Sequence, residues 1–224
     1  LPVESPIHGP RQLLNDPSEP VPSPYGWHDT NGATGVEYNI TRGNNVYAYE
    51  DANNDNLPGY SPDGGALQTF NYPYHPDSSN AYIRDASLTN LFYMNNMIHD
   101  VLYQHGFNEV AGNFQSNNYG NGGLGNDFVN AEGLDGGGTN NANFATPVDG
   151  GSGRMQMYLW TAPTPDRDGD VDNGIIVHEF GHALSDHASP LSNTGLERRA
   201  IDEGYGDYFA ASYSRKFSDY NWEN

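Results

Sequence analysis

The chain contains no cysteine among its 224 residues, which excludes disulfide bridges and thiolate metal sites. Basic residues are also few, since 9 Lys and Arg stand against 29 Asp and Glu and give a formal charge of −20. This charge argues against a nucleic-acid partner, because phosphates select basic surfaces. No apolar run approaches the roughly 20 residues of a membrane span. We therefore expect an acidic protein with no membrane span, stabilised by packing and bound ions.

The most informative stretch is the pentad His178-Glu179-Phe180-Gly181-His182. On an α-helix, residues four apart are separated by about 6 Å of rise and roughly 40° of rotation, so both imidazoles can face one small cation. The remaining apolar positions fall on the opposite face: Ile176, Phe180, Ala183 and Leu184. The pattern predicts an amphipathic helix with His178 and His182 as zinc ligands and Glu179 as the base that acts on a bound water.

A second stretch with helical spacing covers residues 199–210. Its carboxylates Glu203 and Asp207 are four apart and share a face. Catalytic zinc usually takes three protein ligands and keeps a fourth position for water, so Glu203 completes a His, His, Glu set. Asp207, one turn further on, is placed to accept the other ring N–H of a ligating histidine. A solvated helix face is the alternative explanation for this pair.

Together, His178-Glu179-x-x-His182 and Glu203-Gly204-x-x-Asp207 resemble the motifs of thermolysin-like zinc peptidases whose third ligand is a glutamate. Further stretches resemble the fungalysin family: residues 25–28, 41–46, 89–93, 106–114 and 138–147. The resemblance runs from about residue 24 to the end. It implies an α+β fold with two lobes, in which the active-site helix joins a β-rich lobe to a helical one. Residues 186–188 and 196–199 look more like bacterial members of the family.

We expect the chain to have three parts. Residues 1–24 contain seven prolines and should form an extended arm on the surface. Residues 25–172 should form the β-rich N-terminal lobe, with one helix near 87–105 that begins at a Ser87 N-cap. Residues 173–224 should form the active-site helix and the beginning of the helical C-terminal lobe.

The stretch from 117 to 143 is rich in glycine and asparagine and has the composition of a linker. The family resemblance instead places residues 141–144 on the edge strand that borders the cleft. An exposed edge can pair with an extended peptide backbone, so Asn141 and Ala142 are the predicted substrate contacts. A flexible loop with no ligand role is the alternative.

Carboxylates occupy every second position just before the active-site helix, at Asp166, Asp168, Asp170 and Asp172. Oxygen ligands favour calcium over zinc, so this series predicts a calcium site. A solvated acidic loop at the helix N-terminus, where negative charge is favourable, accounts for the pattern equally well. The stretch 51–55 is a weaker version of the same signal, and we interpret it as a loop.

The motifs predict a zinc-dependent endopeptidase in which Glu179 is the general base. The alternative is a non-catalytic binding module, stabilised by zinc or calcium, on a protease scaffold. The retention of Glu179 argues against the alternative, since a structural zinc site needs no base. The resemblance implies a secreted, extracellular enzyme that acts on protein or peptide substrates and is made as a zymogen with an upstream propeptide.

The resemblance also implies a tyrosine and a histidine that stabilise the oxyanion of the tetrahedral intermediate. No tyrosine lies between His182 and Glu203, and Asn224 comes only 17 residues after Asp207. We therefore expect this chain to be a fragment of the catalytic unit. The rest of the helical lobe would then lie on a missing segment or on a companion chain.

Overall fold

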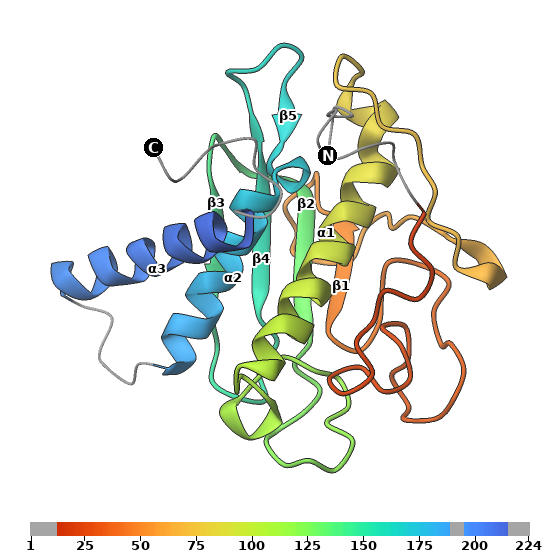
Figure 1. Ribbon diagram of the computed structural model, residues 1–224. Coiled ribbons are helices and arrows are strands. Elements are labelled where there is room, and N and C mark those ends of the chain that lie inside the picture. The colour runs from red at the N-terminus through yellow and green to blue at the C-terminus, as the bar shows by residue number, and fades with distance from the viewer. Residues whose placement is uncertain (1–12, 189–194, 215–224) are drawn as a thin grey trace, which may run out of the picture.

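The computed structural model describes residues 13–188 and 195–214 and has a mixed α+β fold, as expected (Figure 1). Its sheet contains five strands: β1 Val46–Glu50, β2 Val129–Thr139, β3 Ala142–Ala145, β4 Arg154–Trp160 and β5 Arg167–Asp168. Its α-helices are α1 Asn80–Gln104, α2 Asn173–Ala188 and α3 Leu196–Ser214. None of the helices in these two described ranges is both long and apolar enough to span a membrane.

The strand order of the sheet is β1-β2-β4-β3, and β5 pairs with one end of β4. β1, β2 and β4 are parallel, whereas β3 runs antiparallel to β4. In the described residues β3 has no second partner strand, so it forms an edge of the sheet. Alternate residues of the strands are apolar and point to one face, where α1 and α2 pack. The buried strand residues of this core are Val46, Ala48, Val129, Ala131, Ala142, Met155 and Met157.

Helix α1 begins at Asn80 and not near Ser87, so the expected N-cap was wrong. The hydroxyl of Ser87 donates to the carbonyl of Arg84 inside the helix, at 3.1 Å. The first turns are held in place by Ile83, which is 1% exposed. A single buried isoleucine gives too weak a periodic signal to locate this helix start from the sequence. The other end agrees with expectation, since Gly106 follows it with φ +99°.

The described part of the expected arm, residues 13–24, is tied to the C-terminal part of α1. Asp100 on α1 is buried and accepts hydrogen bonds from the Glu19 backbone N–H at 3.0 Å and from the Ser23 hydroxyl at 2.8 Å. The indole of Trp27 donates to the same carboxylate at 2.8 Å. Residues 1–12 of the expected arm lie outside the described residues.

Strand β2 lies inside the glycine-rich stretch and was not predicted from the sequence. Its last residues are mostly glycine, which has low strand propensity and gives no alternating pattern. Packing also requires a glycine in the middle of the strand, because a Cβ at Gly133 would lie 2.6 Å from Leu88 and 2.7 Å from Asp170. Pairing with β1 and β4 on both edges, together with close packing at Gly133, therefore decides the structure of this segment.

Candidate metal centre

Helix α2 carries the pentad and presents its two histidines away from the core. Asp172 stabilises its first turn by accepting a hydrogen bond from the backbone N–H of Gly174 at 2.8 Å. The opposite face is buried as predicted, with Ile176, Phe180 and Ala183 in the hydrophobic core. The packing of this apolar face fixes the direction in which both imidazoles point.

Helix α3 packs against α2 through two glycines. A Cβ built on Gly181 of α2 would lie 2.9 Å from the Cα of Gly206 on α3. A Cβ on Gly206 would in turn lie 2.8 Å from Nδ1 of His178. Real Cβ atoms do not approach other atoms this closely, so the absence of both side chains allows the two helices to come together. Glu203 is carried on this part of α3.

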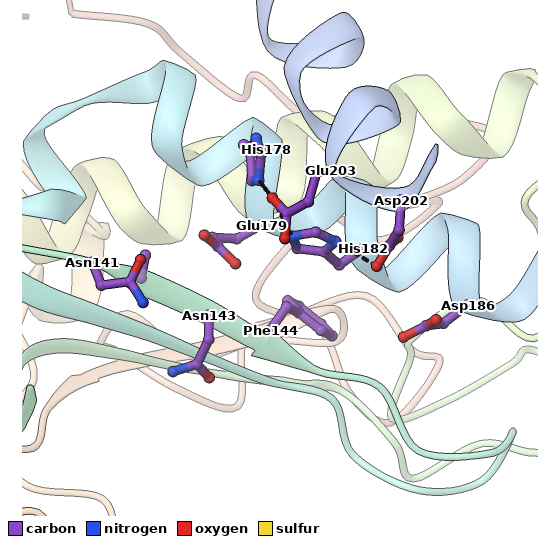
Figure 2. Close-up of a pocket in the computed structure, with 10 residues that line it drawn as sticks. Asn141, Asn143, Phe144, His178, Glu179, His182, Asp186, Asp202 and Glu203 are labelled. Atoms are coloured by element: carbon purple, nitrogen blue, oxygen red, sulfur yellow. Dashed lines mark ion pairs between the residues drawn. The ribbon is translucent and has the colours of Figure 1, made fainter. Parts of the chain in front are cut away.

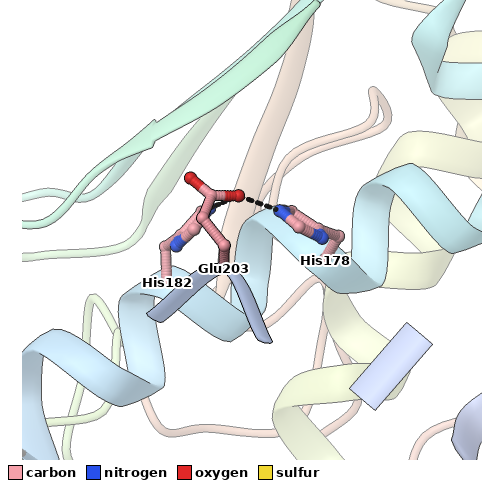
Figure 3. Close-up of side chains that lie close together, drawn as sticks. All are labelled: His178, His182 and Glu203. Carbon is pink, nitrogen blue, oxygen red and sulfur yellow. Dashed lines mark ion pairs between the residues drawn. The ribbon is translucent and has the colours of Figure 1, made fainter. Parts of the chain in front are cut away.

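The three predicted ligands converge (Figure 3). The Glu203 Oε2 lies 3.2 Å from His178 Nε2 and 4.0 Å from His182 Nε2, and one donor atom from each residue lies within 4.8 Å of the others. Two imidazole nitrogens and one carboxylate oxygen are a donor set that catalytic zinc uses. The residues that are present therefore fit the metal that the motif implies.

Each histidine also has an acidic partner on α3 at its other ring nitrogen. His178 Nδ1 lies 3.0 Å from Asp207 Oδ1, as predicted. His182 Nδ1 lies 3.0 Å from Asp202 Oδ2, although the two atoms are not aligned as a hydrogen bond. The Asp202 carboxylate also accepts the Ser185 hydroxyl. Sequence reasoning missed Asp202, and the one available signal was its place next to Glu203, about 100° away around the helix.

Glu179 is 5% exposed and lies on α2 next to the first histidine. Its pKa is raised to about 7, mainly by burial; His178 lowers the pKa, and the negative charges of Glu203 and Asp202 contribute to the rise. Among the described residues its Oε2 has no hydrogen-bond partner. A divalent cation held by the neighbouring ligands would stabilise the ionised form. Glu179 is therefore a buried carboxyl whose protonation depends on that cation.

These groups line one wall of a cleft of about 350 Å³. Figure 2 shows β3 forming the wall that faces α2. The lining residues are Asn141, Ala142, Asn143, Phe144, His178, Glu179, His182, Asp186, Asp202 and Glu203. The two residues expected to contact substrate, Asn141 and Ala142, are thus in the wall opposite the metal ligands. Their role as substrate contacts stays a prediction.

The acidic series before α2 does not converge as a set. Asp168 and Asp170 are buried, whereas Asp166 and Asp172 are exposed. Asp168 accepts backbone N–H groups from Leu134 at 2.7 Å and from Asp170 at 2.9 Å. Among the described residues, this series does not form a group of three close carboxylates. Calcium binding at these positions stays a prediction.

Comparison with known proteins agrees with this geometry. The family model described as fungalysin metallopeptidase (M36) matches residues 1–223. "Probable extracellular metalloproteinase 5" of Arthroderma benhamiae is 45% identical over 227 residues, which cover 97% of this chain and 35% of that protein. "Extracellular metalloproteinase 5" of Trichophyton tonsurans is 44% identical over 225 residues, covering 97% of this chain and 36% of that protein.

A third relative, "Probable extracellular metalloproteinase 2" of Arthroderma benhamiae, is 43% identical over 226 residues, covering 92% of this chain and 35% of that protein. The chain thus spans about a third of the length of the relatives that it matches. These relatives give no support to the expected resemblance of residues 186–188 and 196–199 to bacterial members. The match over almost the whole chain shows that it belongs to the fungalysin (M36) metallopeptidase family.

Proposed function

We propose that this chain carries the catalytic centre of a zinc-dependent endopeptidase. The observation that carries the proposal is the convergence of His178, His182 and Glu203 in the wall of a cleft that also contains Glu179. Three protein ligands leave one position of a catalytic zinc site for chemistry. Membership of a metallopeptidase family and relatives named as extracellular metalloproteinases support the same function.

In the proposed reaction, the zinc ion and the residues around its ligands have separate roles. Bound zinc supplies a Lewis acid that polarises a carbonyl and lowers the pKa of water from about 15.7 towards 7. Glu179 takes a proton from the attacking water and delivers it to the amine nitrogen as the C–N bond breaks. The Oε2 of Glu179 supports this role, because no donor in the described part of the chain occupies it. Asp207 accepts a hydrogen bond from Nδ1 of His178 and Asp202 lies beside Nδ1 of His182, which leaves Nε2 of both rings for the metal.

An extended peptide is the substrate that we propose for this cleft. The outer edge of β3 offers backbone N–H and C=O groups that can pair with an extended chain. Asn141 and Ala142 would contact that chain on the side opposite Glu179. A peptide held in this way would have one of its bonds between β3 and the zinc ligands.

We also propose the organisation expected from the sequence, with an arm over residues 1–24, a β-rich lobe over 25–172 and the start of a helical lobe over 173–224. The rest of that lobe, including the oxyanion-stabilising residues, and an upstream propeptide would come from sequence outside this chain. The names of the relatives and the strongly acidic composition support a secreted, extracellular protein.

Replacement of Glu179 by Gln tests the role of the base. We expect Glu179→Gln to bind one zinc as the wild type does, because the three ligands are unchanged. Its casein hydrolysis should fall by about 10²–10⁴-fold, the usual contribution of general acid–base catalysis. Zinc content and peptide release should be measured on the same preparation of the longest natural polypeptide that contains this chain.

His182→Ala is the matched control and should lose both zinc and hydrolysis. Proteolysis by zinc-loaded Glu179→Gln at the wild-type rate would contradict the assignment of the base. A wild-type protein that binds zinc stoichiometrically but cleaves neither casein nor unfolded peptides would instead favour the non-catalytic binding module.

A further inference from the structure

A second cluster of carboxylates lies away from the zinc ligands, where β1 ends beside β2 (Figure 1). One carboxylate oxygen from each of Asp51, Glu132 and Asp135 lies within 4.8 Å of the others, and all three residues are buried. Asp51 directly follows β1, and the other two belong to β2. The cleft with the zinc ligands is lined by β3, at the far end of the strand order, so the two groups are separate.

A bulge in β2 brings Glu132 and Asp135 together. Residues three apart on a regular strand point to opposite faces of the sheet. Here the pairing with β4 shifts register between Glu132 and Asp135, and Leu134 between them has φ +49°. Gly133 faces Leu88 of α1, so its neighbour Glu132 points to the other face of the sheet. The irregular backbone between them places the carboxylate of Asp135 on the same face as that of Glu132.

The hydrogen bonds of the cluster leave much of its acceptor capacity unused. Glu132 Oε1 accepts the Tyr49 hydroxyl at 2.8 Å, but Oε2 is buried without a hydrogen-bond partner in residues 13–188 and 195–214. Asp51 accepts two backbone N–H groups, and Asp135 accepts one backbone N–H and the Gln156 amide. Three ionised carboxylates offer about twelve acceptor positions, so these hydrogen bonds use fewer than half of them.

The charge of the cluster is also incompletely balanced. The pKa of Glu132 is raised to about 7, mainly by burial and also by Asp135, whereas the Tyr49 hydroxyl and the charge of Arg154 lower it. The guanidinium of Arg154 also donates to the side chain of Asn56. One guanidinium can offset only one of three negative charges. Burial of ionised carboxylates is unfavourable unless positive charge or a shared proton compensates it.

We propose that Asp51, Glu132 and Asp135 bind a calcium ion. All the available ligand atoms are oxygens, which calcium prefers, whereas zinc favours nitrogen and sulfur. Calcium–oxygen distances of 2.3–2.6 Å allow oxygens up to about 4.6–5.2 Å apart to bind one ion, and the three carboxylate oxygens lie within 4.8 Å of one another. Magnesium dehydrates reluctantly and is usually held by one or two carboxylates with waters or substrate phosphates, so a buried group of three carboxylates favours calcium. The ion would join the loop after β1 to the bulge of β2.

Calorimetric titration with calcium chloride tests this proposal on purified protein that holds zinc and has been freed of calcium. We expect one saturable site with a Kd at or below about 1 mM, the weak limit for extracellular calcium modules. Glu132→Gln and Asp135→Asn should each weaken calcium binding at least tenfold. Glu197→Gln is the matched control, since it removes an exposed carboxylate on α3, outside both the cluster and the acidic series before α2, and should bind calcium as the wild type does. The readout does not depend on peptidase activity.

Absence of saturable calcium binding by the wild type up to about 10 mM would overturn the proposal and leave a shared proton as the compensating group. Unchanged binding in both cluster variants would overturn it as well. If Asp170→Asn loses calcium binding and Glu132→Gln keeps it, the ion binds at the buried Asp168 and Asp170 and not at the cluster, and the proposal is overturned. If the cluster variants fail to fold, a crystal structure of the wild type grown with calcium decides the matter. An ion between the three carboxylates supports the proposal, and an ion found only elsewhere refutes it.

Discussion

Gly206→Ala is expected to weaken zinc binding although Gly206 is not a ligand. A Cβ at this position would lie 2.8 Å from Nδ1 and 2.9 Å from Cε1 and Cγ of the His178 ring. Ordinary contact begins at 3.4 Å, so the ring or the helix must move by about 0.6 Å. Because the contact includes Cγ, rotation of the ring about its own axis cannot relieve it. His178 must therefore move as a whole, or α3 must retreat with Glu203.

A zinc site tolerates deviations of only about 0.2 Å in its ligand distances. We therefore expect the zinc Kd of Gly206→Ala to rise about 10–100-fold, the range found when the supporting groups of metal ligands are changed. This range corresponds to about 1.4–2.7 kcal/mol. Competition with a chromogenic chelator measures the zinc affinity, and circular dichroism checks that the helices are retained.

Gly204→Ala is the matched control, because it makes the same change on the same helix. A Cβ on Gly204 would have no atom of the described residues within 4 Å, so zinc affinity should be unchanged. The helix itself should gain up to about 1 kcal/mol from the better propensity of alanine. A Gly206→Ala protein that binds zinc within twofold of Gly204→Ala would refute the reasoning. It would mean that the close approach of α3 does not set the ligand geometry.

Two further predictions concern a histidine partner and acid stability. Asp207→Asn should raise the zinc Kd about 10–100-fold in the same chelator assay, because Asp207 lies 3.0 Å from His178 Nδ1, whereas Glu197→Gln on α3 should not. A similar loss of zinc affinity in both variants would mean that the overall negative charge of α3 sets the affinity, and not the contact of Asp207 with His178. Burial lowers the pKa of His28 from 6.5 to about 4, so the unfolded chain binds the proton more readily and stability is lost as pH falls from 6.5 towards 4. Between pH 7 and about 4.5, zinc-free wild type should lose roughly 2–3 kcal/mol more unfolding free energy in urea than His28→Gln. Equal losses of unfolding free energy in the two proteins would contradict the lowered pKa of His28. Asp127 has a raised pKa, which acts in the opposite direction, but it is present in both proteins and so does not affect their difference.

The sequence predicted the parts of this fold that local spacing determines. The four-residue interval between His178 and His182, with apolar residues on the opposite face, was sufficient to predict α2 and the side of it that carries the ligands. The same four-residue spacing predicted that Glu203 and Asp207 lie on one face of a helix, near the same histidine. The family resemblance supplied the position of the edge strand, which composition alone did not indicate.

The features that were missed depend on contacts between distant segments. β2 is glycine-rich and becomes a strand because β1 and β4 pair with both of its edges. Asp202 meets His182 only after α3 has packed on α2, and the close approach at Gly206 has no local signal at all. Asp51 and Asp135 are 84 positions apart, so their proximity follows from strand pairing and a bulge. Sequence periodicity cannot report such contacts.

The most direct test of the zinc centre is anomalous diffraction at the zinc edge from crystals of the protein grown with one equivalent of zinc. We predict a single peak within about 2.0–2.2 Å of Nε2 of His178, Nε2 of His182 and a carboxylate oxygen of Glu203. A peak bound to the histidines with Glu203 beyond bonding distance, or a zinc ion located only at other residues, would contradict the account.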